Sequence, residues 1–302
     1  MTRKKPAFDA AQHSADKWIA RLKAAKASGT SWEKPWISGG FALPINASTG
    51  NEYRGVNILS LIGEAQEKGY SSNQWASYKQ WQAKGCQVKR GETGTYIIFY
   101  RIIEKEDGDK LPLIRYSKVF NGCQVEGADV VDVDEKRPSL AQRLDNAETF
   151  VSNTGAEILH SDQRRAYYRR RPSDLIHMPN RDLFTDTASS SATENYYSTL
   201  LHELTHWTGD KRRLDREKGG RFGDSEYAFE ELVAELGSAF LCAHLGITTE
   251  PRADHAHYLN SWIECLTDHP KALLTACARA SDALDYLRDL QEEKEEKEEL
   301  AA

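Results

Sequence analysis

The sequence lacks long apolar runs and has few cysteines. No apolar stretch in the 302 residues approaches the roughly 20 residues that a membrane-spanning helix needs. The basic start, MTRKKPAFDAAQHSADKW, is not followed by the apolar segment of a secretory signal. The five cysteines are odd in number and form no CxxC pair, which argues against a disulfide framework and against a cysteine-based zinc site. We therefore expect a protein of the reducing cytoplasm, with no membrane partner.

Charge and aromatic residues are distributed unevenly along the chain. The net charge is −6, yet residues 1–125 hold 19 Lys and Arg against 11 Asp and Glu, a net charge of +8. The remaining residues have a net charge of −14, and five of the seven tryptophans lie before residue 126. This asymmetry indicates two domains with different partners, of which the first is suited to a polyanion.

The first part of the chain mixes helical and strand patterns. Apolar residues at helical spacing predict three helices, over 9–27, 57–68 and 72–84. Apolar-rich segments separated by glycines and a charged loop then predict three strands, over 86–89, 95–103 and 113–120. We therefore expect an α+β domain over residues 1–125.

The second part of the chain is mainly helical by pattern. The acidic segment 126–139, EGADVVDVDEKRPS, contains a proline and is typical of a linker. Helical spacing then predicts five helices, over 141–153, 193–209, 227–245, 253–268 and 270–297. Two short strands are predicted at 156–160 and 175–178. The chain as a whole is therefore expected to be α+β.

The pentapeptide His202-Glu203-Leu204-Thr205-His206 has the HExxH pattern. On a helix, residues i and i+4 share a face, so both imidazoles can reach one cation at about 2 Å, as tetrahedral zinc requires. Glu203 would act as general base towards a water held at that cation. The flanking residues are apolar, and burying unpaired His and Glu would cost several kcal/mol, so two surface histidines are the weaker interpretation. We expect a divalent metal centre that favours zinc, although manganese or cobalt could occupy the same ligands.

Zinc needs a third protein ligand, and the helix predicted at 227–245 carries candidates for it. Glu231 and Glu235 are four residues apart and share a face, so one could bind the metal while the other hydrogen-bonds a ligand imidazole. The residues alone leave the order of the two open. Single histidines further along the chain are rival third ligands: His244, His255, His257 and His269.

The segment from Glu231 to Glu235, ELVAE, resembles the ExxA(D/N) helix that follows HExxH in glutamate-type zincins. The resemblance implies that Glu231 is the metal ligand and that Glu235 supports a ligand imidazole. The chain departs from that pattern because it has Glu rather than Asp or Asn at the last position.

Longer segments resemble the ArdC-type antirestriction proteins of conjugative plasmids, whose N-terminal module also opens certain plasmid-transfer primases. In the second half these segments are IHMP (176–179), YYSTLLHELTHWTG (196–209), RRLDR (212–216), YAFEELVAELGSAFL (227–241) and YLNSWIECL (258–266). In the first half they are LPINASTGNEYRGVNILSL (43–61), QWASYKQW (74–81), GCQVKRGETG (85–94) and KVFNGCQVEG (118–127). The resemblance implies a domain that binds single-stranded DNA (1–125), a linker (126–139) and a zincin-like metallopeptidase domain (140–302). It also implies protection of incoming plasmid DNA from the recipient's restriction systems.

The residues of the first domain fit single-strand binding, which combines a cationic groove with aromatic platforms worth about 1–3 kcal/mol per stacked base. The candidate DNA-binding residues are aromatic or basic: Arg54, Trp75, Tyr78, Lys79, Trp81, Lys84, Lys89 and Arg90. The competing interpretation is that the tryptophans belong to the core and that the lysines are simply solvated.

Three functions are compatible with these features. The first is a metallopeptidase that DNA binding directs to a target such as a host restriction protein, with the strand at 175–178 as an edge strand that pairs with substrate. The second is a non-enzymatic protein that coats single-stranded DNA and uses the metal only to stabilise its fold. The third is a DNA-independent peptidase whose first domain binds protein.

Binding of single-stranded DNA predicts a steep salt dependence, because each phosphate contact releases counterions. We expect the logarithm of the association constant of the full chain for a labelled single strand to fall with the logarithm of salt concentration. The expected slope is about −0.7 per phosphate contact. Fluorescence anisotropy over a salt series measures it. A flat response, or equal affinity for duplex DNA, would contradict the prediction.

Overall fold

The computed structural model describes residues 9–27, 42–104, 110–130, 132–133, 135, 137–187, 189–216, 225–248 and 259–301. Its helices are α1 (Ala10–Ala27), α2 (Val56–Lys68), α3 (Tyr78–Ala83), α4 (Leu140–Asn153), α5 (Ala192–Thr208), α6 (Ser225–Leu245), α7 (Leu259–Asp268) and α8 (Lys271–Ala301). Its strands are β1 (Ile45–Asn46), β2 (Gln74–Ser77), β3 (Gln87–Val88), β4 (Thr95–Glu104), β5 (Lys110–Asn121), β6 (Val125–Glu126), β7 (Glu157–Ser161), β8 (Tyr167–Arg169) and β9 (Leu175–Pro179). The predicted α+β class is confirmed. Within these residues, no helix has both the length and the apolar character that crossing a bilayer demands.

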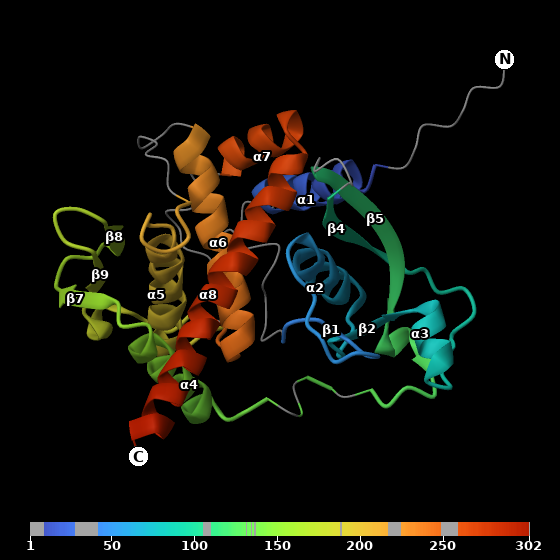
Figure 1. Ribbon diagram of the computed structural model, residues 1–302, viewed down its shortest axis with the longest axis horizontal. Helices are drawn as coiled ribbons and strands as arrows, with labels where there is room; N and C mark the ends of the chain where they lie inside the picture. Colours follow the sequence, from blue (N-terminus) through green and yellow to red (C-terminus); the bar gives the residue numbers. More distant parts are fainter. Residues whose placement is uncertain are drawn as a thin grey trace.

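Helix α8 runs diagonally through the molecule, between two groups of elements (Figure 1). On one side lie α2 and a four-stranded sheet in the order β1-β2-β5-β4. On the other side lie α5 and a three-stranded sheet in the order β7-β9-β8. Residues from α8 contact α2 on the first side and α4, α5 and α6 on the second. The last long helix therefore packs against both parts of the chain.

The predicted helix over 72–84 is wrong in its first half. Residues Gln74–Ser77 form β2, which lies between β1 and β5. Trp75 and Ala76 are both buried, as expected for a central strand covered on both faces. The helix begins only at Tyr78, where the Ser77 hydroxyl accepts from the backbone N–H of Gln80 in a capping box. Residues 74–77 form a strand because they pair with β5, which is distant in sequence. Local helical spacing cannot predict such a long-range pairing.

The strand expected at 175–178 exists as β9, but its expected place at a sheet edge is wrong. Residues Leu175–Pro179 pair with β7 in parallel and with β8 antiparallel, so β9 is the central strand. All five of its residues are buried, which agrees with that position. The short strand β8, which the sequence pattern did not predict, is an edge of this sheet and contacts α5.

One apolar core joins the first and second parts of the chain. Trp18 and Leu22 of α1 are buried in the same cluster as Leu204 of α5 and Phe240 of α6. Helix α1 also packs against α7 and α8. Because both parts of the chain share this core, the structure gives no boundary between them. The domain over 1–125, the linker over 126–139 and the domain over 140–302 remain predictions.

A buried ion pair anchors the start of α5. Ser191 and Glu194 form a capping box at this end, and the Glu194 carboxylate lies 3.0 Å from the guanidinium of Arg143 on α4. The same carboxylate accepts from the backbone N–H of Thr248, which follows α6, at 3.1 Å. Arg143 in turn donates to the carbonyl of Gly246. Through Glu194, the N-terminus of α5, the helix that carries HExxH, therefore contacts α4 and the residues that follow α6.

Loss of the Glu194 charge should destabilise the fold in a pH-dependent way. Burial raises the pKa of Glu194, but hydrogen bonds from Ser191, Thr248 and Arg143 outweigh it and hold the pKa below its ordinary value. A lowered pKa stabilises the fold above the ordinary value of about 4.3, and this stabilisation is lost as pH falls through the folded-state pKa. We expect Glu194→Ala to lower the free energy of unfolding at pH 7 by about 3–5 kcal/mol, because Arg143 is left buried without its partner.

Urea unfolding of the wild type and of Glu194→Gln, at pH 7 and near pH 3, measures this effect. The stability difference between the two proteins should shrink at the lower pH. The exposed Glu157, changed to Gln, is a control that should show little difference at either pH. An equal loss for Glu194→Gln at both pH values would contradict the prediction.

Candidate metal centre

Helices α5 and α6 bring the three predicted metal ligands together. His202 and His206 lie one turn apart on α5, with ring centroids separated by 4.8 Å. Glu231 of α6 faces them, with one carboxylate oxygen 3.6 Å from His202 Nε2 and the other 3.6 Å from His206 Nε2. All three ligand atoms lie within 4.8 Å of one another. The spacing of HExxH and its partner glutamate in sequence thus corresponds to one cluster in space.

The distances in this cluster suit a small cation. A separation of 3.6 Å is too long for a hydrogen bond between nitrogen and oxygen. Metal–ligand distances of about 2.1 Å in a tetrahedral site place neighbouring ligand atoms about 3.4 Å apart. Two imidazoles and a carboxylate also form a ligand set that zinc accepts in catalytic sites with one open position. The residues present therefore fit a divalent metal.

Glu235 occupies the supporting position that the zincin resemblance implied. Its carboxylate oxygen lies 3.2 Å from His202 Nδ1, on the side of the ring that faces away from Glu231. The Glu235 side chain is fully buried on α6. A carboxylate at this position fixes the ring orientation and leaves Nε2 directed at the metal position. Glu231 and Glu235 thus lie on opposite sides of the His202 ring.

The second imidazole has a carboxylate beside its Nδ1 atom that sequence reasoning missed. Glu230 Oε1 lies 3.6 Å from His206 Nδ1, and Arg216 holds the same oxygen at 3.0 Å. Arg216 is buried and also donates to the hydroxyl of Thr208 at the end of α5. In the sequence, Glu230 is recognisable only as the residue before Glu231. Its ion pair with Arg216 could not be predicted, because no sequence pattern brings these two residues together.

Glu203 and Tyr227 complete the surroundings of the cluster. Glu203 follows His202 on α5 and is buried. Tyr227, one turn before Glu231 on α6, donates a hydrogen bond to the Glu231 carboxylate. A role of Glu203 as general base remains a prediction.

Carboxylates outnumber imidazoles in this buried cluster. Burial lowers the pKa of His202, but the carboxylates of Glu231 and Glu235 outweigh it and raise the pKa to about 9. Burial also raises the pKa of Glu231, yet the charges of His206 and His202 outweigh that effect and lower the pKa to about 2. The raised pKa of His202 reflects the carboxylates around its ring, and the lowered pKa of Glu231 reflects the two imidazoles that it faces. Because the carboxylates outnumber the imidazoles, a bound divalent cation would neutralise the remaining negative charge.

A glycine sets the distance between the two helices. A Cβ added to Gly237 of α6 would lie 2.4 Å from the methyl carbon of Thr205 on α5, closer than real contacts allow. Only glycine permits this approach of the two helices within the HExxH segment. Two of the rival ligands lie elsewhere. His244 is beside Phe150 of α4, and His269 is exposed after α7. His255 and His257 lie outside the described residues.

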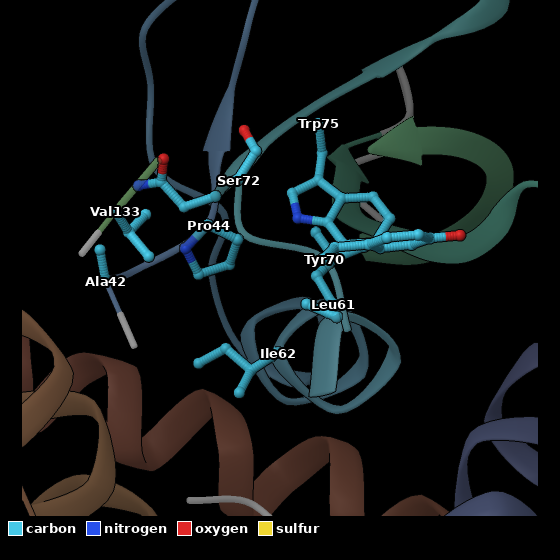
Figure 2. Close-up of a pocket in the computed structure, with 10 residues that line it drawn as sticks. Ala42, Pro44, Leu61, Ile62, Tyr70, Ser72, Trp75 and Val133 are labelled. Atoms are coloured by element: carbon cyan, nitrogen blue, oxygen red, sulfur yellow. The ribbon is translucent and has the colours of Figure 1, made fainter. Parts of the chain in front are cut away.

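The structure corrects two of the candidate DNA-binding residues. Trp75 and Trp81 are each 1% exposed, so their faces are not available to bases. Figure 2 shows the indole of Trp75 beside Tyr70 and above Leu61 of α2, and these three residues belong to one apolar cluster. The Trp81 indole N–H donates to the carbonyl of Phe120 at 2.9 Å. Both tryptophans are core residues, which was the competing interpretation.

The remaining candidates lie at the surface. Arg54 pairs with Asp282 and Asp285 of α8, so it contributes to the contact between the two parts of the chain. The other five are exposed around α3 and β3: Tyr78, Lys79, Lys84, Lys89 and Arg90. A contribution of these five to DNA binding remains a prediction.

Comparison with known proteins gives two adjacent family matches. Residues 8–143 match the N-terminal domain of anti-restriction factor ArdC, and residues 145–279 match a zincin-like metallopeptidase domain. The second match contains both helices of the metal centre.

Similar proteins extend over most of the chain. Protein y4eC of Sinorhizobium fredii (strain NBRC 101917 / NGR234) is 36% identical over 289 residues, which cover 90% of each protein. DNA primase TraC of Escherichia coli is 35% identical over 304 residues, and these cover 92% of this chain but 27% of that primase. Crystal structures of the antirestriction ArdC protein from plasmid R388 give TM-scores of 0.74 without metal and 0.72 with Mn(II) bound, at 37% and 38% identity. Each comparison covers 94% of this chain and 98% of the R388 protein.

Metal affinity should depend on the residues of the cluster in a graded way. We expect Glu231→Ala to abolish high-affinity zinc binding and the accompanying rise in melting temperature. We expect Glu235→Ala and Glu230→Ala to weaken binding about 10- to 100-fold, because these carboxylates lie beside the Nδ1 atoms of the ligand imidazoles and do not bind the metal themselves. Isothermal titration calorimetry with zinc and with manganese measures both effects.

The exposed Glu226, in the first turn of α6, is a matched control whose change to Ala should leave affinity intact. Full affinity in Glu231→Ala, combined with loss in His244→Ala, would show that the ligand set is wrong.

Proposed function

The chain belongs to the ArdC antirestriction family, and from that premise we propose that it binds single-stranded DNA and uses a zinc-peptidase-type centre to protect incoming conjugative plasmid DNA from host restriction. The observation that carries the enzymatic part is the convergence of His202, His206 and Glu231, with Glu203 beside them. The reaction class that fits this arrangement is hydrolysis of a peptide bond.

The residues around the metal position have separable roles in this proposal. When bound, zinc supplies Lewis-acid chemistry, which lowers the pKa of water and polarises a carbonyl group. Glu203 accepts a proton from the attacking water and returns it to the leaving amine. Glu235 orients the His202 ring, and Glu230 places a negative charge beside Nδ1 of His206. Manganese and cobalt fit the same ligands, and the R388 relative was crystallised with Mn(II).

The DNA-binding part of the proposal is supported by relatives and by composition. The first half of the chain has a net charge of +8 and matches a domain of an anti-restriction factor. The similarity to DNA primase TraC is consistent with a nucleic-acid partner. A protein of the host restriction system is the proposed target, and the five free cysteines support a cytoplasmic location.

A non-enzymatic protein that coats DNA is the second candidate, and the burial of the site favours it. The side chains of His202 and Glu231 are 4% and 9% exposed, as in a metal site that stabilises a fold. The His206 side chain, at 13%, is the most exposed of the three ligands and marks the side from which substrate would approach.

Substitution of Glu203 separates the two candidates. We expect Glu203→Ala to keep zinc binding and DNA binding but to lose protection of a plasmid that is transferred into a restricting recipient. Removal of the general base should slow peptide hydrolysis about 10²- to 10⁴-fold. Transfer frequency into restricting and non-restricting recipients is the measurement.

The exposed Glu226→Ala variant controls for expression and folding. Full protection by Glu203→Ala would reject the enzymatic proposal and support the coating protein.

A further inference from the structure

Aromatic and basic side chains form a row along the β4–β5 hairpin and the start of α3. Tyr78, Tyr116 and Lys118 are exposed, whereas Tyr96 and Phe120 are partly buried. We call the following residues the aromatic row: Tyr78, Tyr96, Tyr116, Lys118 and Phe120. Figure 1 shows β5 as a long curved strand that extends from the neighbourhood of α1 towards α3. The row therefore follows one side of the part of the chain proposed to bind DNA.

The strand register places the row on one face. Tyr96 of β4 is directly opposite Lys118 of β5, and paired residues point to the same face of a sheet. Tyr116, Lys118 and Phe120 alternate along β5, so they share this face and repeat every 6.6–6.8 Å or so. Tyr78 joins the end of the row, because its ring centroid lies 6.4 Å from that of Phe120.

The side chains of the row contact one another. The Lys118 ammonium lies 4.8 Å from the centroid of the Tyr96 ring, and the Tyr96 and Tyr116 rings are 6.1 Å apart. Gly94, just before β4, permits the close approach at the Phe120 end, since an added Cβ would lie 3.0 Å from the Phe120 ring. Mutual contact limits the rotamers of these side chains, so less conformational entropy is lost when a ligand binds.

The opposite face of the hairpin holds the row in place. Ile97 and Val119 are buried with Trp75 in an apolar cluster, which fixes the orientation of both strands. Tyr116 and Tyr78 nevertheless remain 49% and 44% exposed. Trp75 thus acts on the surface indirectly, as part of the support beneath it.

Single-stranded DNA is the ligand that this chemistry fits. Bases stack on exposed aromatic rings, and ammonium groups between the rings contact the phosphates. Lys118 lies within the row, and the exposed Lys79 follows Tyr78 at its end. We propose that the aromatic row is the surface on which the bases of single-stranded DNA stack, a proposal that rests on the DNA-binding function proposed above.

The hairpin supplies its own matched controls. Phe99 is 53% exposed, lies directly opposite Arg115, and points to the other face of the same two strands. Tyr116→Ala and Lys118→Ala therefore test the row, while Phe99→Ala and Arg115→Ala remove an equally exposed ring and another cation from the opposite face. Tyr116→Phe preserves the ring and removes only the hydroxyl.

Fluorescence anisotropy of the full chain with labelled oligothymidylate measures the affinity. We expect Tyr116→Ala to weaken binding about 5- to 150-fold, the range of a lost base stack, and Tyr116→Phe to bind like the wild type. Lys118→Ala should reduce the magnitude of the salt slope by about 0.7, the contribution of one phosphate contact to a single strand. The Phe99 and Arg115 variants should leave affinity and slope unchanged, and melting temperatures confirm that every variant is folded.

The possible failures are distinguishable. If Tyr116→Ala and Lys118→Ala bind oligothymidylate as tightly as the wild type, the aromatic row is not the binding surface, although the proposed DNA-binding function stands. The same conclusion follows if Phe99→Ala and Arg115→Ala weaken binding as much as the variants of the row. No binding of oligothymidylate by the wild type would overturn both. Equal competition by duplex DNA would also overturn the row, because bases within a duplex are not free to stack on side chains.

Discussion

The contact between α5 and α6 at Thr205 and Gly237 determines whether the metal centre can exist. Each helix alone presents only part of the ligand set, and the two parts meet because no side chain at position 237 keeps the helices apart. Six residues before Gly237 on α6, Glu231 lies opposite both imidazoles at this spacing. A site with metal–ligand bonds of about 2 Å tolerates errors of only a few tenths of an ångström. Metal binding therefore requires the close packing of α5 against α6.

The buried charges of this centre link folding to metal binding. Glu203, Glu230, Glu231 and Glu235 lie around two imidazoles, while Arg216 balances only the Glu230 side of the cluster. Uncompensated buried carboxylates carry a large desolvation cost, which a divalent cation offsets. Metal that binds the folded chain more tightly than the unfolded chain also adds to stability by mass action. The ligand helices lie in the main apolar core, so this stabilisation acts on the centre of the fold.

The sequence predicted local features well and tertiary ones poorly. The HExxH histidines follow from helical spacing alone, and most helices and the β4–β5 hairpin lie close to where periodicity placed them. Trp75 and Trp81 were misassigned because an aromatic residue next to lysines has the same pattern whether its ring is buried or exposed. The β2 segment was misassigned for a related reason, since pairing with β5 outweighs its helical spacing. The ion pair of Glu230 and Arg216 beside His206 joins residues that are distant in sequence, so no local pattern predicts it.

The packing of α1 against α7 and α8 has a consequence for how the chain must be dissected and how it folds. Trp18 and Leu22 find their apolar partners more than 200 residues later, so this part of the core closes only after most of the chain is available. A fragment limited to residues 1–125 would expose those side chains to water and would be prone to aggregate. Point substitutions in the intact chain are therefore the sound way to separate its activities. During synthesis on the ribosome, α1 therefore cannot complete its packing until α7 and α8 have been translated.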